Sequence, residues 1–241
     1  MSKVKRILSV IMAMVMVLAM SVPTFAATTP TANDTAKGTV QNVEKAATVT
    51  AYQITKAQYD GGFIGYVKTD NKLAIADVLA PTSDEVTAIA KQIASGAVTL
   101  KSKTMTGAAV ADDVKYTDFT ADLNAGYWLV IVSGTVDEVY NPMLVGVYYS
   151  ANGSDNTMTS NPVNADSNWT LETSNAYAKS TTPSIKKEIV GGETAKGNDV
   201  AIGDTVNFKI TTAIPSYSKQ YNTVTVAISD TMSAGLTLDK N

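Results

Sequence analysis

The feature of this sequence that most constrains its fold is an alternation of apolar and polar residues with a period of two. It recurs in residues 48–54, 202–210 and 224–228, where β-branched or aromatic residues return at every second position. Residues 126–132 are instead a continuous apolar run that is too short for a buried helix and rich in β-forming residues. Glycine pairs and asparagine-rich turns separate these runs. The chain is therefore predicted to be mainly β.

One segment, residues 84–95, has the pattern of a helix. Ser83 precedes it as an N-cap, and Asp84 and Glu85 fall in the first turn, where the helix dipole favours negative charge. Gly96 follows its end. Apolar residues stand at helical spacing, namely Val86, Ile89, Ala90 and Ile93. An amphipathic helix packed on a sheet is expected here.

Residues 1–26 have the layout of a secretory signal peptide. Three basic residues in the first six are followed by an apolar run and by small residues before an expected cut after Ala26. A membrane anchor is the alternative, but the run is about 14 residues long and a spanning helix needs roughly 20. No later apolar run is longer. We therefore expect export and no membrane span in the mature chain.

The composition argues against several functional classes. Without the signal peptide the chain holds 16 basic and 22 acidic residues, a net charge of −6, and no arginine, which disfavours a nucleic-acid partner. The chain has neither cysteine nor histidine, so it lacks the usual metal ligands and the Ser-His and Cys-His nucleophile pairs. We expect no cofactor and no enzyme, and any covalent tie between strands must use side chains other than cysteine.

The mature chain divides into two regions. Residues 27–180 are predicted to form the first domain, beginning with a small, polar and flexible stretch at residues 27–36. The Ser/Thr/Pro-rich residues 180–184 mark a boundary. Residues 181–241 are predicted to begin a second, all-β domain. This segment is shorter than a typical domain, which has about 100 residues or more. The chain is thus expected to be a fragment of a longer protein.

Lys187 is a candidate nucleophile. In an extended strand at residues 184–189, Ile185, Lys187 and Ile189 share one face. If the isoleucines face the core, the lysine amine is buried, loses its proton readily and becomes nucleophilic. An exposed edge strand with the amine reaching water is the alternative.

Asp230 is a candidate acid for the same chemistry. It lies in phase with the row Val224, Val226 and Ile228, at the end of a predicted inward-facing strand face. A carboxylic acid beside a neutral amine can shuttle protons and polarise a carbonyl group. A turn cap at the strand end is the alternative role, because Asp-Thr is also typical of turns.

The junction between the two regions resembles a known family. Residues 177–187, Tyr-Ala-Lys-Ser-Thr-Thr-Pro-Ser-Ile-Lys-Lys, resemble the junction of sortase-assembled Gram-positive pilin backbone subunits, the second region resembling a fimbrial D2 domain that forms an isopeptide bond. The resemblance extends to shorter segments at 51–54, 125–129, 202–206, 214–215 and 229–237. It implies two tandem immunoglobulin-like or CnaA-B-like β-sandwich domains, the first with a short helix and the second incomplete.

The resemblance also implies roles for particular lysines. Lys179 takes the place of the junction lysine that accepts the acyl group of a neighbouring subunit from a sortase, although Tyr177-Ala178-Lys179 matches the family's Tyr-Pro-Lys motif only in part. Lys187, or Lys186 if the strand register differs by one, takes the place of the lysine in an internal Lys-Asn isopeptide bond. Asp230 takes the place of the assisting acid. The partner asparagine is expected beyond Asn241.

The predicted function is a structural subunit of a cell-surface fimbria, with other pilin subunits and a sortase as partners. The alternative is a tip or surface adhesin of the same fold, which binds a host glycan or matrix protein and needs no acceptor lysine. A secreted glycosidase would need two acids converging in a cleft, and no such pair can be placed. The family's Leu-Pro-x-Thr-Gly sorting signal is not found in the sequence.

Overall fold

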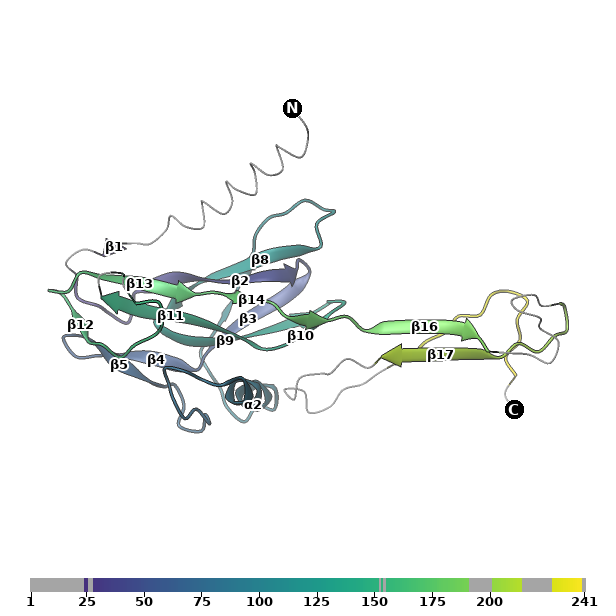
Figure 1. The fold of residues 1–241 in the computed structure, drawn as a ribbon, viewed down its shortest axis with the longest axis horizontal. Coiled ribbons are helices and arrows are strands. Elements are labelled where there is room, and N and C mark those ends of the chain that lie inside the picture. Colours follow the sequence, from purple (N-terminus) through teal and green to yellow (C-terminus); the bar gives the residue numbers. More distant parts are fainter. Residues whose placement is uncertain are drawn as a thin grey trace, which may run out of the picture.

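Within its described residues, the structure, a computed structural model, contains a β-sandwich with one helix and a separate two-stranded ribbon (Figure 1). The mainly β prediction is confirmed. The structure describes residues 24–25, 28–151, 153, 155–190, 201–213 and 227–239. The predicted signal peptide therefore lies outside the described residues, except for β1 (Thr24–Phe25), which pairs with the sandwich strand β13.

The larger sheet of the sandwich has the strand order β1-β13-β11-β9-β3-β6. The bounds of its other strands are β3 (Ala47–Gln53), β6 (Ser102–Thr104), β9 (Gly126–Gly134), β11 (Met143–Ala151) and β13 (Trp169–Ser174). In β9, Trp128 and Val130 face the main core while Leu129 belongs to a second apolar cluster beneath the helix. Both faces of β9 are covered, which explains its continuous apolar run.

Gly126 begins β9 for a steric reason. Its φ is +135°, and a Cβ atom there would lie 2.0 Å from the carbonyl oxygen of Thr55. Only glycine allows the two backbones to approach this closely.

The second sheet has the order β14-β2-β8-β7 and closes the other side of the core. Its strands are β2 (Thr35–Glu44), β7 (Thr106–Gly107), β8 (Tyr116–Asn124) and β14 (Ala176–Tyr177). Strand β14 pairs with β2 in the parallel direction, and the other pairs are antiparallel. Fully buried Val40, Val49 and Trp128 lie between the two sheets. Their burial is the main source of stability of the sandwich.

Three smaller sheets complete the described structure. One has the order β12-β5-β4, with β4 (Thr55–Tyr59), β5 (Gly62–Lys68) and β12 (Val163–Asn164). Another joins β10 (Val139–Tyr140) to β15 (Ser180–Thr181), and the ribbon joins β16 (Ser184–Ile189) to β17 (Phe208–Ala213). The ribbon extends beyond the end of the sandwich at which β10 lies (Figure 1).

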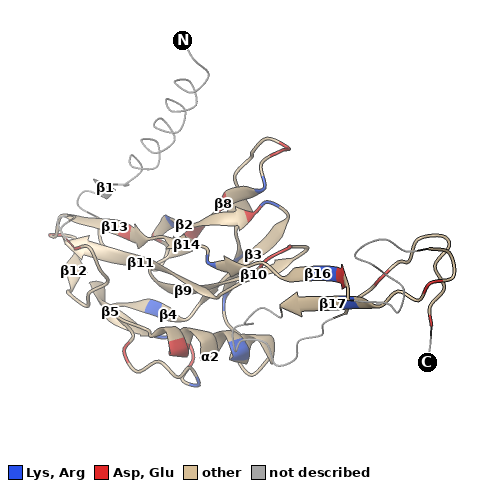
Figure 2. Cartoon of the chain, turned by 45° about the vertical axis from the view of Figure 1, so that its right-hand side comes forward, with Lys and Arg blue, Asp and Glu red and all other residues tan. Residues whose placement is uncertain are grey.

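The predicted helix is α2 (Ser83–Ala94), but its N-cap is Thr82 and not Ser83. The Thr82 hydroxyl accepts the backbone N–H of Glu85, and the Glu85 carboxylate accepts the backbone N–H of Thr82. These two reciprocal hydrogen bonds satisfy two backbone N–H groups, which explains why Thr82 is the N-cap. Figure 2 shows acidic residues at one end of α2 and a basic residue near the other. No helix among the described residues is long and apolar enough to cross a membrane.

The expectation of a flexible start is wrong for residues 28–34. The indole N–H of Trp169 donates to the Thr28 carbonyl oxygen at 2.8 Å. The Tyr149 hydroxyl donates to the Thr31 carbonyl oxygen and lies 2.9 Å from an Asp34 carboxylate oxygen. Buried aromatic side chains therefore fix this segment, because their polar atoms need partners.

The second region differs from the prediction in its strand bounds. The strand expected at residues 202–210 is observed only from Phe208, because the Asp204 side chain accepts the backbone N–H of Ala201 and closes a turn there. Val224 and Val226, which set the predicted phase of Asp230, lie outside the described residues. Asp230 is described, but residues 227–230 are not in a strand and Ile228 is 51% exposed, so the predicted inward-facing row is not observed there.

Candidate functional site

Lys179 lies in a segment that is bonded to the sandwich on both sides of it. We call residues 176–181 the junction segment. Before Lys179, strand β14 pairs with β2, and the Ala178 N–H donates to the Gln41 carbonyl oxygen at 2.9 Å. After it, β15 pairs with β10, and the Lys179 carbonyl oxygen accepts the Asn141 N–H at 3.1 Å. Its backbone is thus fixed, unlike that of a solvated linker lysine.

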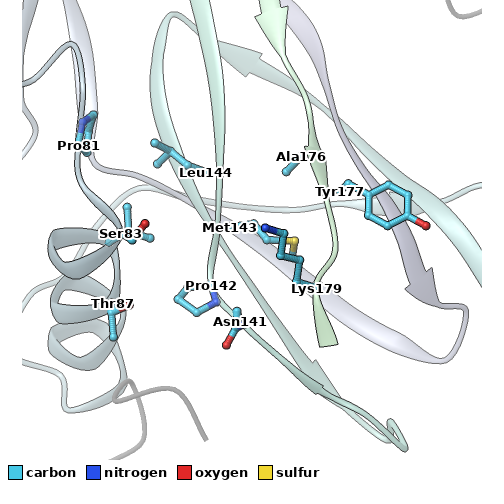
Figure 3. A pocket seen from close by; sticks show the side chains of 11 residues that line it. Pro81, Ser83, Thr87, Asn141, Pro142, Met143, Leu144, Ala176, Tyr177 and Lys179 are labelled. Carbon is cyan, nitrogen blue, oxygen red and sulfur yellow. The ribbon is translucent and has the colours of Figure 1, made fainter. Parts of the chain in front are cut away.

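The exposed Lys179 side chain lines a pocket of about 520 Å³. One wall comes from the start of α2 and the segment that leads into it, with Ser83, Thr87 and Pro81. The facing wall comes from the start of β11, with Met143 and Leu144. In Figure 3 the Lys179 side chain runs past Met143 toward the pocket, whereas the Tyr177 ring points away. The pocket leaves the amine open to a second molecule.

The structure brings Lys187 and Asp230 together. The Lys187 amine lies 2.9 Å and 2.7 Å from the two carboxylate oxygens of Asp230. The two residues are 43 positions apart in the sequence. Lys187 stands opposite Ile210 in the ribbon, and its amine lies 4.6 Å from the centre of the Phe208 ring. The pair therefore combines an amine, an acid and an apolar surface.

Lys187 is less buried than the sequence led us to expect. Its side chain is 34% exposed and that of Asp230 is 37% exposed, and Ile185 on the same strand is 64% exposed. The reason is that β16 and β17 form a sheet of only two strands, and no second sheet covers it among the described residues. The amine is accordingly held here as one half of an ion pair.

Lys186 faces away from this pair. Its amine lies 2.5 Å from a carboxylate oxygen of Glu188, and its side chain is 70% exposed. Alternation along β16 separates it from the Lys187 side. The geometry therefore favours Lys187 over Lys186 as the partner of Asp230.

The sequence did not reveal a second charged cluster beside the junction segment. It contains Glu44, Lys115 and Glu138, and the two acids are buried. No local pattern marks either glutamate, because both become buried only when distant strands pair. No group of side chains suited to a metal ion is found within the described residues.

Comparison with known proteins agrees with this architecture. Residues 33–180 match the family model described as the T6 antigen Ig-like domain. The trypsin-resistant surface T6 protein of Streptococcus pyogenes serotype M6 is 31% identical over 214 residues, which cover 87% of this chain and 38% of the relative.

A solved structure supports the same relationship. It is that of the T6 backbone pilin of serotype M6 Streptococcus pyogenes, described as a modular three-domain structure with variable loops and extensions, and it matches with a TM-score of 0.59 and 27% identity. The match covers 79% of this chain and 38% of that one. The resemblance to Gram-positive pilins is thereby confirmed. Since the family model covers more than half of the sequence, the chain belongs to the T6 antigen Ig-like domain family.

Proposed function

We propose that this chain is part of a structural subunit of a cell-surface pilus, and that Lys179 is the residue through which a sortase joins one subunit to the next. The observation that carries the proposal is the position of Lys179. The lysine sits in a fixed backbone segment, and its side chain lines an open pocket in a fold whose relatives include a backbone pilin.

The proposed reaction is an acyl transfer. A sortase holds the end of the neighbouring subunit as a thioester on its cysteine, and the neutral amine of Lys179 attacks that carbonyl carbon. A C–N bond forms, the C–S bond breaks, and the amine proton passes to the departing sulfur. An amine that is already positioned lowers the entropic barrier to such a step. The pocket beside Lys179 would receive the arriving peptide end.

The test uses the purified mature chain, the sortase of its cell and a labelled peptide that carries the sorting signal. Peptide mapping by mass spectrometry is expected to find the label on Lys179, and Lys179→Arg should remove it. Lys37→Arg is the matched control, because Lys37 is an exposed lysine of the same sandwich. Labelling that persists in Lys179→Arg would contradict the proposal. No labelling of the parent chain would favour the adhesin alternative.

We further propose that Lys187 forms an internal isopeptide bond with an asparagine, assisted by Asp230. The neutral amine attacks the side-chain amide carbon, Asp230 transfers the proton to the leaving nitrogen, and ammonia departs as the C–N bond forms. The contact between the amine and both Asp230 oxygens supports this assignment, because it places the acid where the proton must move. Covering the ribbon with further strands would remove the amine from water and favour its neutral form.

Intact-mass measurement of the whole surface protein isolated from its cells tests this bond. We expect a mass deficit of one ammonia that disappears in Lys187→Ala and in Asp230→Ala. Lys186→Ala is the matched control and should retain the deficit. An unchanged deficit in Lys187→Ala would contradict the assignment.

The export and domain organisation belong to the same proposal. Residues 1–26 would direct export and be removed, residues 27–180 would form the first domain, and residues 181–241 would begin the second. The chain spans only 38% of the length of each matched relative, so the roles of the whole subunit are inferred. N-terminal sequencing of the mature protein checks the cut after Ala26.

A further inference from the structure

Two buried acids and a partly exposed lysine form a charged cluster that contacts the junction segment through Ser180. The Lys115 amine is 3.2 Å from Glu44 Oε1 and 3.3 Å from Glu138 Oε1. The side chains of Glu44 and Glu138 are only 7% and 6% exposed. Buried acids are rare unless they are paired, so this cluster is a built feature of the sandwich and not an incidental surface contact.

A bulge in β2 brings Glu44 into the cluster. The register of β2 against β8 shifts between Val40 and Val43, with Asn42 at a φ of +62°. Because of the extra residue, both valines face the core and Glu44 faces the opposite side. Glu44 Oε2 accepts the backbone N–H groups of Asp137 at 3.0 Å and Glu138 at 3.2 Å. Glu44 thus fixes the short loop that carries Glu138.

Glu138 in turn has partners on both of its carboxylate oxygens. Oε1 accepts the Tyr116 hydroxyl and the Lys115 amine, and Oε2 accepts the Ser180 hydroxyl at 2.6 Å. Burial raises the pKa of Glu138, but the hydrogen bonds from Ser180, Tyr116 and Lys115 outweigh it and hold the pKa below its ordinary value. The carboxylate is therefore ionised near neutral pH and accepts a charge-assisted hydrogen bond from the Ser180 hydroxyl.

Ser180 follows Lys179 directly in the chain. Neighbouring side chains of an extended segment point to opposite sides, so a hydroxyl held toward Glu138 directs Lys179 away from the cluster and toward the pocket. The strand pairs on either side of Lys179 are each only two residues long. The side-chain bond to Ser180 therefore controls the rotation of the segment about its own axis.

We propose that Glu138 and Ser180 are positioning residues for Lys179, acting through the backbone of the junction segment. Glu44 and Lys115 support Glu138, and we call Glu44, Lys115, Glu138 and Ser180 the junction clamp. The inference rests on the proposed acceptor function of Lys179. A displacement of about 1 Å at a reacting group can reduce a rate by as much as about 100-fold, so releasing Ser180 should slow acyl transfer.

The test measures the rate of sortase-catalysed labelling against the concentration of the acceptor chain. In Ser180→Ala we expect kcat to fall about tenfold with KM little changed, because misplacement affects the reacting geometry more than encounter. Ser180→Thr keeps the hydroxyl and should restore the rate. Ser184→Ala, an exposed serine of the same stretch, is the matched control. Glu138→Gln, which removes the negative charge but keeps the shape, should give an intermediate loss.

Amide hydrogen exchange of Asn141, whose N–H donates to the Lys179 carbonyl, gives a second reading that does not use the sortase. It should speed up in Ser180→Ala and not in Ser180→Thr. Parental kcat and parental exchange in Ser180→Ala, or equal losses in the alanine and threonine variants, would overturn the positioning role. Labelling that survives Lys179→Arg would instead overturn the acceptor function, and the positioning role with it.

Discussion

Two of the lysine–carboxylate sites among the described residues differ in the burial of their acids and in the number of partners that those acids have. In the sandwich, Lys115 faces the buried acids Glu44 and Glu138, whose oxygens also accept backbone and hydroxyl donors. In the ribbon, Lys187 faces Asp230 alone among carboxylates in the described residues, and about a third of each side chain is exposed. The first arrangement suits a fixed ion network, whereas the second places a lysine beside one acid and an aromatic ring.

The difference shows that a lysine–carboxylate ion pair does not by itself identify a functional site. Near the junction, hydrogen bonds raise the pKa of the Lys115 amine, led by the bond with Glu44, which keeps the amine protonated and unreactive. Lys187 has fewer partners, so covering its face with apolar strands would remove its charge more readily. What surrounds a lysine decides whether it stabilises a fold or reacts.

The largest expected difference between the sandwich and the ribbon is in the stability lost when an aromatic side chain is truncated. Trp128→Ala should destabilise the sandwich by about 3–5 kcal/mol, because Trp128 is fully buried and truncation leaves a cavity. Phe208→Ala in the ribbon should cost at most about 1 kcal/mol, because Phe208 is 43% exposed and its ring contacts the Lys187 amine. Urea unfolding followed by circular dichroism measures both. Equal losses would break the contrast between a packed sandwich and an open ribbon.

A smaller contrast is expected between the two charged sites. Glu44→Ala leaves the N–H groups of Asp137 and Glu138, of which only the second is buried, without their acceptor, which should cost about 1–3 kcal/mol. Asp230→Ala removes an ion pair that is a third exposed, so it should cost at most about 1 kcal/mol. The same urea experiment compares the two variants. A larger loss in Asp230→Ala would contradict the view that the Glu44 network contributes more to stability than the Lys187–Asp230 pair does.

The smallest expected effect is a pH dependence from Glu138. Its pKa is lowered in the folded chain from an ordinary value of 4.5, so its contribution to stability is complete above that value. The contribution is lost as the pH falls through the lower, folded pKa. The groups around it are Glu44, Lys115, Tyr116, Asp137 and Tyr140, and burial raises the pKa of Tyr140 to about 12, far from this range.

Unfolding free energies measured from pH 7 to pH 3 check this dependence. The parent chain should lose stability below about pH 4.5, and Glu138→Gln should lose less over the same interval. Equal slopes for the two chains would show that other carboxylates carry the acid sensitivity. A larger acid loss in Glu138→Gln than in the parent chain would contradict the direction of the Glu138 shift.

Local patterns predicted a large part of the fold. The apolar run around Trp128 gave β9, and the helical spacing of Val86 and Ile89 gave α2. The N-cap was placed one residue late, because Thr82 gains a reciprocal bond with Glu85 that Ser83 cannot make. Period and capping chemistry are local, so the sequence carries them directly.

Features that depend on distant pairing could not be predicted in the same way. The burial of Glu44 follows from a bulge against β8, and that of Glu138 from the pairing of β10 with β15. Lys187 and Asp230 lie together in the structure, but the lysine is more exposed than the phase argument predicted, because only two strands surround it. Register and sheet coverage are set by the whole chain.

The measurement that tests the account most directly is peptide mapping of the polymers on the surface of the cells that make this protein. If Lys179 joins the subunits, digestion should release a branched peptide in which the Lys179 side chain carries the carboxyl end of a neighbouring subunit. The same branch should vanish in Lys179→Arg cells together with the polymers. Polymers that form normally in those cells, with their branch at another lysine, would contradict the account.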